Sequence, residues 1–361
     1  MNKTLAAILT LLCLTLAAQA QELVWDVDFN TVFNNREGGD DMRPDQTFLF
    51  TRLKPEVGLQ IGKDSVGGIH LLKGGVSWYQ PINDTGKGYA VDPILYYRFN
   101  NSHWSVAVGA MPRTITHREP LYMLSDSMNY VSQRLRGVWT QYRHDDGSYF
   151  DAYLDWRQMQ SKTRREAFMV YGGGRWYAAG TDDNGFWLGG HLRYNHLAKQ
   201  KEAPEGQGVN DDFTFSPLVG YSHRGTRSLL DAEAGAVLNL ERARVDHKTH
   251  SPAGFVARVN WQYRWLEAEE NLFAGKDLFP LYERFGSELN MGDTYYRSKF
   301  YSRTDLKAHI VRTAFVDLNV GLTFHATDKI TGFWQQVACR FYFDRQMAHK
   351  RFPKQKLTST Y

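Results

Sequence analysis

The sequence contains very little cysteine and has no long apolar run beyond its first twenty residues. Only two cysteines occur in 361 residues, and Cys13 lies within the N-terminal apolar segment. Removal of that segment leaves Cys339 alone, so no disulfide within the mature chain can stabilise the fold. The lack of a further run of roughly 20 apolar residues excludes a helical membrane protein. The near balance of 43 basic and 39 acidic residues gives no indication of nucleic-acid binding.

The N-terminus has the three parts of a secretory signal peptide. Lys3 supplies positive charge, residues 5–16 form an apolar run, and Ala18-Gln19-Ala20 provides small residues for cleavage. The apolar run is too short to span a bilayer. We therefore expect residues 1–20 to be removed after Ala20 during export.

The mature chain combines a polar average composition with many aromatic residues. Its mean hydropathy is −0.49 for the whole sequence, whereas 14% of the residues are aromatic. A transmembrane β-barrel accounts for both values, because only every second residue of a strand faces lipid and aromatic girdles mark the two membrane interfaces.

Alternation of apolar and polar residues supports this interpretation. In residues 148–158, one face of the predicted strand carries Phe150, Leu154 and Trp156, and the other face carries charged and tyrosine side chains. Segments 255–265 and 314–325 repeat the pattern over a length that suits a membrane strand.

The pattern predicts an all-β, antiparallel up-and-down barrel in residues 21–343, followed by a basic tail in residues 344–361. A weak extra strand at 270–285 gives an even number of 16 strands, with 14 as the alternative. The predicted connections alternate between short turns and long outer loops, and none is predicted to fill the barrel. The other strands are expected at 23–33, 47–61, 68–80, 90–100, 103–113, 134–144, 148–158, 166–178, 185–197, 212–223, 228–241, 254–266, 299–311, 314–325 and 330–343.

Residues Val108-Gly109-Ala110-Met111-Pro112-Arg113 and the long loop after them resemble the strand ends of specific porins related to the phosphate-selective group. The resemblance implies an outer-membrane porin of a Gram-negative bacterium. The sequence departs from it at the C-terminus, where the aromatic Phe341-Tyr342-Phe343 is followed by further basic residues instead of ending the chain.

The polar faces of the predicted strands place many charged side chains in the lumen. Arginines occur on successive strands, with carboxylates on the opposite wall, which suggests either a charged pore lining or a packed interior of ion pairs. The pore-lining candidates are Arg98, Arg113, Arg143, Arg157, Arg175, Arg193, Asp151, Asp155, Asp231, Glu233, Arg258 and Arg264.

These features predict a porin-like channel for small polar or anionic solutes, with no enzymatic activity, cofactor or metal. A barrel whose outer loops bind a glycan, peptide or lipoprotein is the first alternative, and a barrel hydrolase is the second. Expected partners are outer-membrane lipid and lipopolysaccharide, the barrel-assembly machinery and small polar solutes, with a homo-oligomer of the chain as a further option. Loop histidines such as His117, His247 and His250 match no catalytic or metal motif.

Overall fold

The computed structural model describes residues 22–40, 43–62, 67–82, 89–131, 133–313 and 315–345. The predicted signal peptide and most of the predicted basic tail lie outside these residues.

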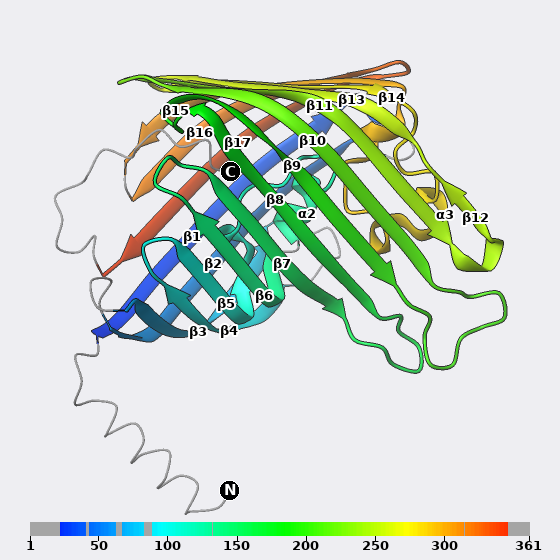
Figure 1. Cartoon of the computed structure of the whole chain (residues 1–361), viewed down its shortest axis with the longest axis horizontal. Helices are drawn as coiled ribbons and strands as arrows, with labels where there is room; N and C mark the ends of the chain where they lie inside the picture. The colour runs from blue at the N-terminus through cyan, green and yellow to red at the C-terminus, as the bar shows by residue number, and fades with distance from the viewer. Residues whose placement is uncertain are drawn as a thin grey trace, which may run out of the picture.

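The described residues form a closed antiparallel β-barrel of sixteen long strands (Figure 1). A further short strand, β12 (Lys248–His250), pairs only with the end of β11. The long strands are β1 (Glu22–Glu37), β2 (Gln46–Ile61), β3 (Ile69–Pro81), β4 (Ala90–Asn100), β5 (Trp104–Pro112), β6 (Arg134–Arg143), β7 (Tyr149–Gln158), β8 (Ala167–Gly180), β9 (Asn184–Leu197), β10 (Asn210–Arg224), β11 (Ser228–Ala243), β13 (Ala253–Tyr263), β14 (Leu266–Gly275), β15 (Phe300–Arg312), β16 (Val316–Thr327) and β17 (Thr331–Asp344).

The first and last strands close the ring. β1 pairs with β17 from Asp26 opposite Asp344 to Glu37 opposite Phe333. Closure matters in a membrane because hydrocarbon provides no partner for a free backbone N–H or C=O group.

The predicted barrel and its count of 16 strands are confirmed. The extra strand is β14, which ends at Gly275 instead of reaching residue 285. The predicted faces of the strands also agree with the structure: Phe150 is 49% exposed on the outside, whereas Asp151 next to it is fully buried.

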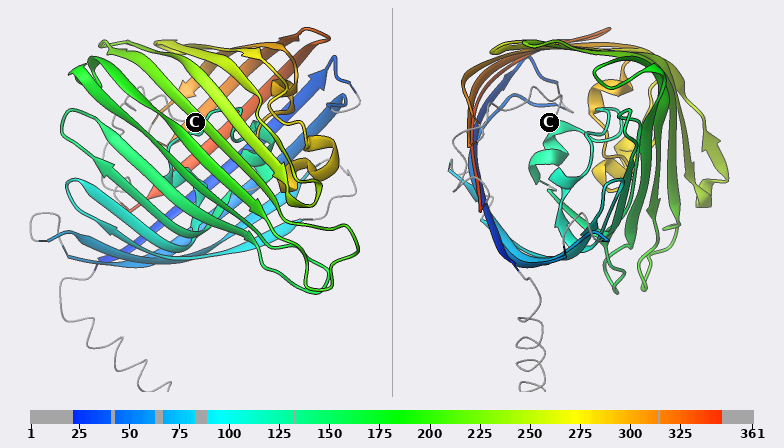
Figure 2. Two further views of the ribbon diagram at one scale, coloured as in Figure 1. Left: turned by 45° about the vertical axis from the view of Figure 1, so that its right-hand side comes forward. Right: turned by 60° about the vertical axis from the view of Figure 1, so that its left-hand side comes forward.

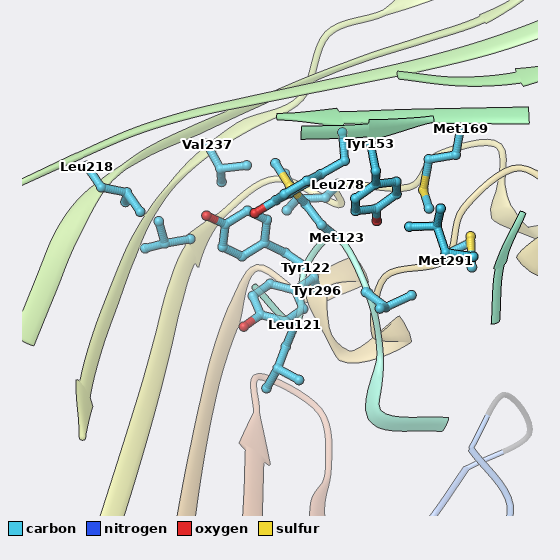
Figure 3. Packing of buried hydrophobic residues seen from close by; sticks show 14 of the residues in the cluster. Leu121, Tyr122, Met123, Tyr153, Met169, Leu218, Val237, Leu278, Met291 and Tyr296 are labelled. Carbon is cyan, nitrogen blue, oxygen red and sulfur yellow. The ribbon is translucent and has the colours of Figure 1, made fainter. Parts of the chain in front are cut away.

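Two long loops fold into the barrel, contrary to the expectation of outer loops and an unfilled lumen. Loop L3 joins β5 to β6 and contains α2 (Asp126–Val131), and loop L7 joins β14 to β15 and contains α3 (Tyr282–Phe285). Figure 2 shows both loops lying within the ring of strands. Their apolar side chains explain this position, because L3 residues 121–124 and the L7 residues Leu278 and Phe279 are buried in the main hydrophobic cluster (Figure 3).

The two loops also bind each other through backbone hydrogen bonds. The amide of Asp293 donates to the carbonyl of Leu121 at 2.8 Å, and the amide of Ser125 donates to the carbonyl of Met291 at 2.8 Å. L3 and L7 therefore form one continuous filling of the lumen. No helix in the described part of the chain is long and apolar enough to cross a membrane.

The β1–β17 register can be tested with the native cysteine. Cys339 lies directly opposite Thr31, and directly opposite residues are within the Cα range that a disulfide requires. We expect Thr31→Cys to form a disulfide with Cys339 under mild oxidation, which would change the gel migration of the boiled, unreduced protein. The matched control Phe33→Cys lies opposite Val337 and should not crosslink. Equal crosslinking of both variants would contradict the register.

Candidate active site

The lumen is filled with paired charges. Arg175 binds Asp231 at 2.7 Å and Glu233 at 2.8 Å, and Arg258 bridges Glu233 at 3.1 Å and Glu269 at 3.2 Å. Burial of such charges is favourable only when partners compensate for the lost hydration. The geometry is that of a packed, ion-paired interior.

The other predicted lumen residues belong to the same interior, with one exception. Arg264 lies in the turn between β13 and β14 with φ of 56°, is exposed, and stacks on the neighbouring Tyr263. The prediction that Arg264 lines a pore is therefore wrong, because the predicted strand at 254–266 ends at residue 263. On the lumen side, Arg113 pairs with Asp155 and Glu119, and Arg193 pairs with Asp212. Arg157 donates hydrogen bonds to backbone carbonyls of L7, and the guanidinium of Arg98 lies over the ring of Trp139. Arg143 approaches His117, which pairs with Asp151.

A cavity of about 210 Å³ lies beneath L3 on the side of the short turns. His117 of L3 lines this cavity, and its Nδ1 lies 3.0 Å from Asp151. The Nε2 of the same ring lies 3.4 Å from the guanidinium of Arg143. This histidine therefore faces a charged, polar space in the lumen.

A second lumen histidine, His309, has both ring nitrogens engaged. Its Nδ1 lies 2.8 Å from Asp317 and its Nε2 lies 3.3 Å from Glu267. With no free nitrogen and a fully buried side chain, its role is to connect strands. Within the described ranges, no group of three or more His, Cys, Asp and Glu side chains is placed to hold a metal ion.

A third histidine–carboxylate pair lies on the outside of the barrel. Phe168, His196, Asp211 and Arg242 are direct cross-strand neighbours on β8, β9, β10 and β11. They alternate with the buried lumen residues Ala167, Leu197, Asn210 and Ala243. We call these four outward residues the rim row, because each is one residue from the loop end of its strand.

The rim row holds its histidine in a defined orientation. His196 Nδ1 lies 2.8 Å from Asp211, which also accepts hydrogen bonds from Tyr194 and Arg244, each at 2.7 Å. Phe168 stacks on the imidazole with 4.9 Å between the ring centroids. Among the described residues, no partner hydrogen-bonds to His196 Nε2, so this nitrogen is available for a ligand.

The rim row lies at the boundary between the apolar belt and the loops. Towards the short turns, the next outward row consists of Tyr194, Phe213 and Leu240, and the row after it consists of Leu192, Phe215 and Leu238. Beyond the rim row lie polar loops. Aromatic and apolar outward residues mark the membrane interface of such barrels, so the rim row lies where lipid headgroups meet acyl chains.

L7 supports the rim row from the inside. Leu281 and Leu289 of L7 form a buried cluster with Ala167, Leu197 and Ala243, the lumen neighbours of the rim residues. Glu241 of β11 fixes L7 further, since it accepts from the amide of Leu281 at 2.7 Å and from Asn290 at 2.6 Å. The strand ends that carry the row are therefore supported by packing on their lumen face, which favours a preorganised site.

Sequence reasoning did not identify the rim row. The predicted strand began at residue 212, which left Asp211 in a loop, and only the structure pairs it with His196. The available signal was the placement of Tyr194 and His196 on the lipid-facing side of a predicted membrane strand.

The fold defines the class of the protein, an outer-membrane β-barrel. Solved structures with this architecture include Pseudomonas aeruginosa OccK2 in complex with glucuronate, at 9% identity and a TM-score of 0.52 over 90% of this chain and 98% of that one. The Acinetobacter baumannii outer-membrane channel DcaP has 11% identity and a TM-score of 0.51 over 90% and 97% of the two chains. Likeness at this level of identity concerns the fold alone. No curated protein sequence matches the chain.

The chain belongs to the Lipid A 3'-O-deacylase-type family, whose model matches residues 15–348. This membership overturns two predictions from the sequence: the porin-like channel and the absence of enzymatic activity. It also replaces the resemblance to phosphate-selective porins, which rested on strand patterns that many barrels share. The hydrolase that ranked last among the alternatives is the function to which the family points.

An ion pair that attaches L3 to the barrel wall provides a test of whether L3 is held inside the lumen. Arg303 binds Asp126 at 2.6 Å. Burial opposes ionisation of Asp126, but the guanidinium groups of Arg303 and Arg118 outweigh it and hold the pKa of the carboxyl below its usual range. We expect Asp126→Asn to speed hydrogen exchange in L3 at pH 6 by about tenfold or more, since a hydrogen bond to a charged group contributes roughly 1.5–3 kcal/mol.

The same pair predicts a pH dependence. A carboxyl whose folded pKa is lowered contributes stability above its unfolded pKa, and this contribution is lost as pH falls through the folded value. The difference in L3 exchange between wild type and Asp126→Asn should therefore be constant from pH 5 to 8 and shrink below about pH 4. A difference that grows on acidification would contradict this assignment.

Proposed function

We propose that this protein is an outer-membrane hydrolase that removes an ester-linked acyl chain from a lipid A-type glycolipid, with the rim row as its active site. One observation carries the proposal: the histidine–carboxylate pair of the rim row lies on the membrane-facing side of the wall. Family membership supports the reaction class, and the position of the row at the membrane interface supports access to a lipid ester.

His196 is the proposed general base. With the ring proton on Nδ1, the N–H donates a hydrogen bond to Asp211, and the lone pair of Nε2 is free to accept a proton from an attacking water. The hydroxyl formed from that water adds to the ester carbonyl, and the protonated imidazole then returns the proton to the leaving sugar oxygen. Asp211 holds the tautomer and stabilises the imidazolium. No serine belongs to the rim row, which favours water over a covalent nucleophile.

Arg242 is the proposed anion-binding group. It lies opposite Asp211 on the outward face, is exposed, and forms no ion pair within the described part of the chain. A guanidinium stays charged at any relevant pH and matches phosphate or a developing oxyanion. Arg242 is thus available to hold the phosphorylated headgroup or to stabilise the tetrahedral intermediate.

The proposed location of the reaction requires export and insertion. Cleavage after Ala20 would release the mature chain into the periplasm, and the barrel-assembly machinery would insert it with the long loops outward. The rim row then faces the outer leaflet, where lipopolysaccharide presents its acyl chains.

Substitution of the rim row tests the assignment. We expect His196→Ala to reduce acyl release from lipid A in detergent micelles by roughly 100-fold or more, as loss of a general base does. Arg242→Ala should mainly raise KM if it binds the headgroup. Mass spectrometry of the glycolipid product provides the measurement.

The lumen histidine supplies the matched control. His117→Ala also removes a histidine paired with an aspartate, but it should leave acyl release within about twofold of wild type. Loss of activity in His117→Ala with full activity in His196→Ala would move the active site into the lumen and reject the rim row.

A further inference from the structure

A second polar group on the outside of the barrel lies on β14 and β15, separated from the rim row by β13. Glu270 of β14 alternates with the buried lumen residues Glu269 and Asn271, so its side chain faces outward. Ser302 donates to one carboxylate oxygen at 2.6 Å, and Thr304 donates to the other at 2.5 Å. Both hydroxyls belong to the outward face of β15.

Glu270 has no basic partner among the described residues. Acidic groups on the lipid face of a barrel carry a cost that increases with depth, although it is smaller than for basic groups. Other carboxylates of the wall, such as Asp28 and Asp155, pair with basic side chains. A lipid-facing carboxylate held only by two neutral hydroxyls therefore lacks the cation that would complete its environment.

The wall is hollowed beside these hydroxyls. Ser302 and Thr304 line a hollow of about 470 Å³ together with Phe324, Phe333 and Glu37. Glu270, Thr304, Phe324, Phe333 and Glu37 are successive cross-strand neighbours on β14, β15, β16, β17 and β1. One end of the hollow thus offers acceptor oxygens, and its centre offers two phenyl rings.

We propose that Glu270, Ser302 and Thr304 bind the primary ammonium headgroup of a membrane amphiphile, whose apolar part lies over Phe324 and Phe333. An ammonium carries three N–H donors. The side chains of Glu270, Ser302 and Thr304, which we call the Glu270 cradle, offer three acceptors: the carboxylate and the two hydroxyl oxygens. The protons of these hydroxyls are directed at Glu270. The charges are complementary, and the phenyl rings suit an acyl chain. The site lies on β14 to β17 and β1, so it is independent of the hydrolase proposed for β8 to β11.

Native mass spectrometry of the full barrel provides the test. The protein is released from detergent micelles that contain equal amounts of phosphatidylethanolamine, phosphatidylglycerol and phosphatidylcholine with identical acyl chains. We expect wild type to retain phosphatidylethanolamine at least about tenfold over the other two lipids. The choline headgroup has the same charge but no N–H donor, so equal retention of phosphatidylcholine would overturn the proposed hydrogen-bonded cradle.

Variants locate the site. Glu270→Gln should abolish the preference, and Ser302→Ala with Thr304→Ala should weaken it even if the glutamine variant folds poorly. Glu37→Gln is the matched control, because this second carboxylate of the hollow is bonded by Asn35 and not by the two hydroxyls; it should retain the preference. A Glu270→Gln barrel that still prefers phosphatidylethanolamine, or a wild type without preference, would refute the proposal. Acyl release by the rim row should be unchanged in all these variants.

Discussion

The absence of hydrogen-bonding solvent in the hydrocarbon of a membrane is the constraint on which the rest of this structure depends. It requires a closed ladder, which β1 and β17 complete by pairing along most of their length. A closed ladder of backbone hydrogen bonds fixes the register of all strands. The register places residues that are far apart in sequence directly opposite each other on adjacent strands. The rim row and the Glu270 cradle both arise in this way, because each is a line of cross-strand partners on one face of the wall.

The lumen solves a different problem, since its polar side chains must be neutralised within a small volume. Ion pairs such as Arg175 with Glu233 do this on the wall, and apolar side chains of L3 and L7 pack against lumen-facing apolar residues of the wall, such as Met169 and Val237. L7 also connects the two faces: its Leu281 and Leu289 pack on the inside of the strand ends that carry the rim row outside. The lumen filling is therefore part of what positions the proposed active site.

The alternation of apolar and polar residues was sufficient to predict the barrel, and the features that it did not predict have physical causes. β14 was placed too late because its outward face contains Ala268, Glu270 and Ala274, which gives a weak apolar signal. The filled lumen was missed although residues 121–124 of L3 read Leu-Tyr-Met-Leu, an apolar run that a solvent-exposed loop would not favour. The candidate site could not be found from spacing, since His196 and Asp211 meet only through the β9–β10 register.

Three of the histidines that pair with carboxylates, His117, His196 and His309, show why residue type alone does not define chemistry. His309 uses both nitrogens to hold strands together, so it has no lone pair to offer. His117 has the Asp151 carboxylate on one nitrogen and the Arg143 guanidinium near the other, so neither of its nitrogens is free. His196 is fixed on one side by Asp211 and is open on the other, at the level where acyl chains join headgroups. Of the three, only the rim-row histidine combines an oriented ring, a free nitrogen and access to lipid, and these are the conditions that hydrolysis of a membrane ester imposes on its base.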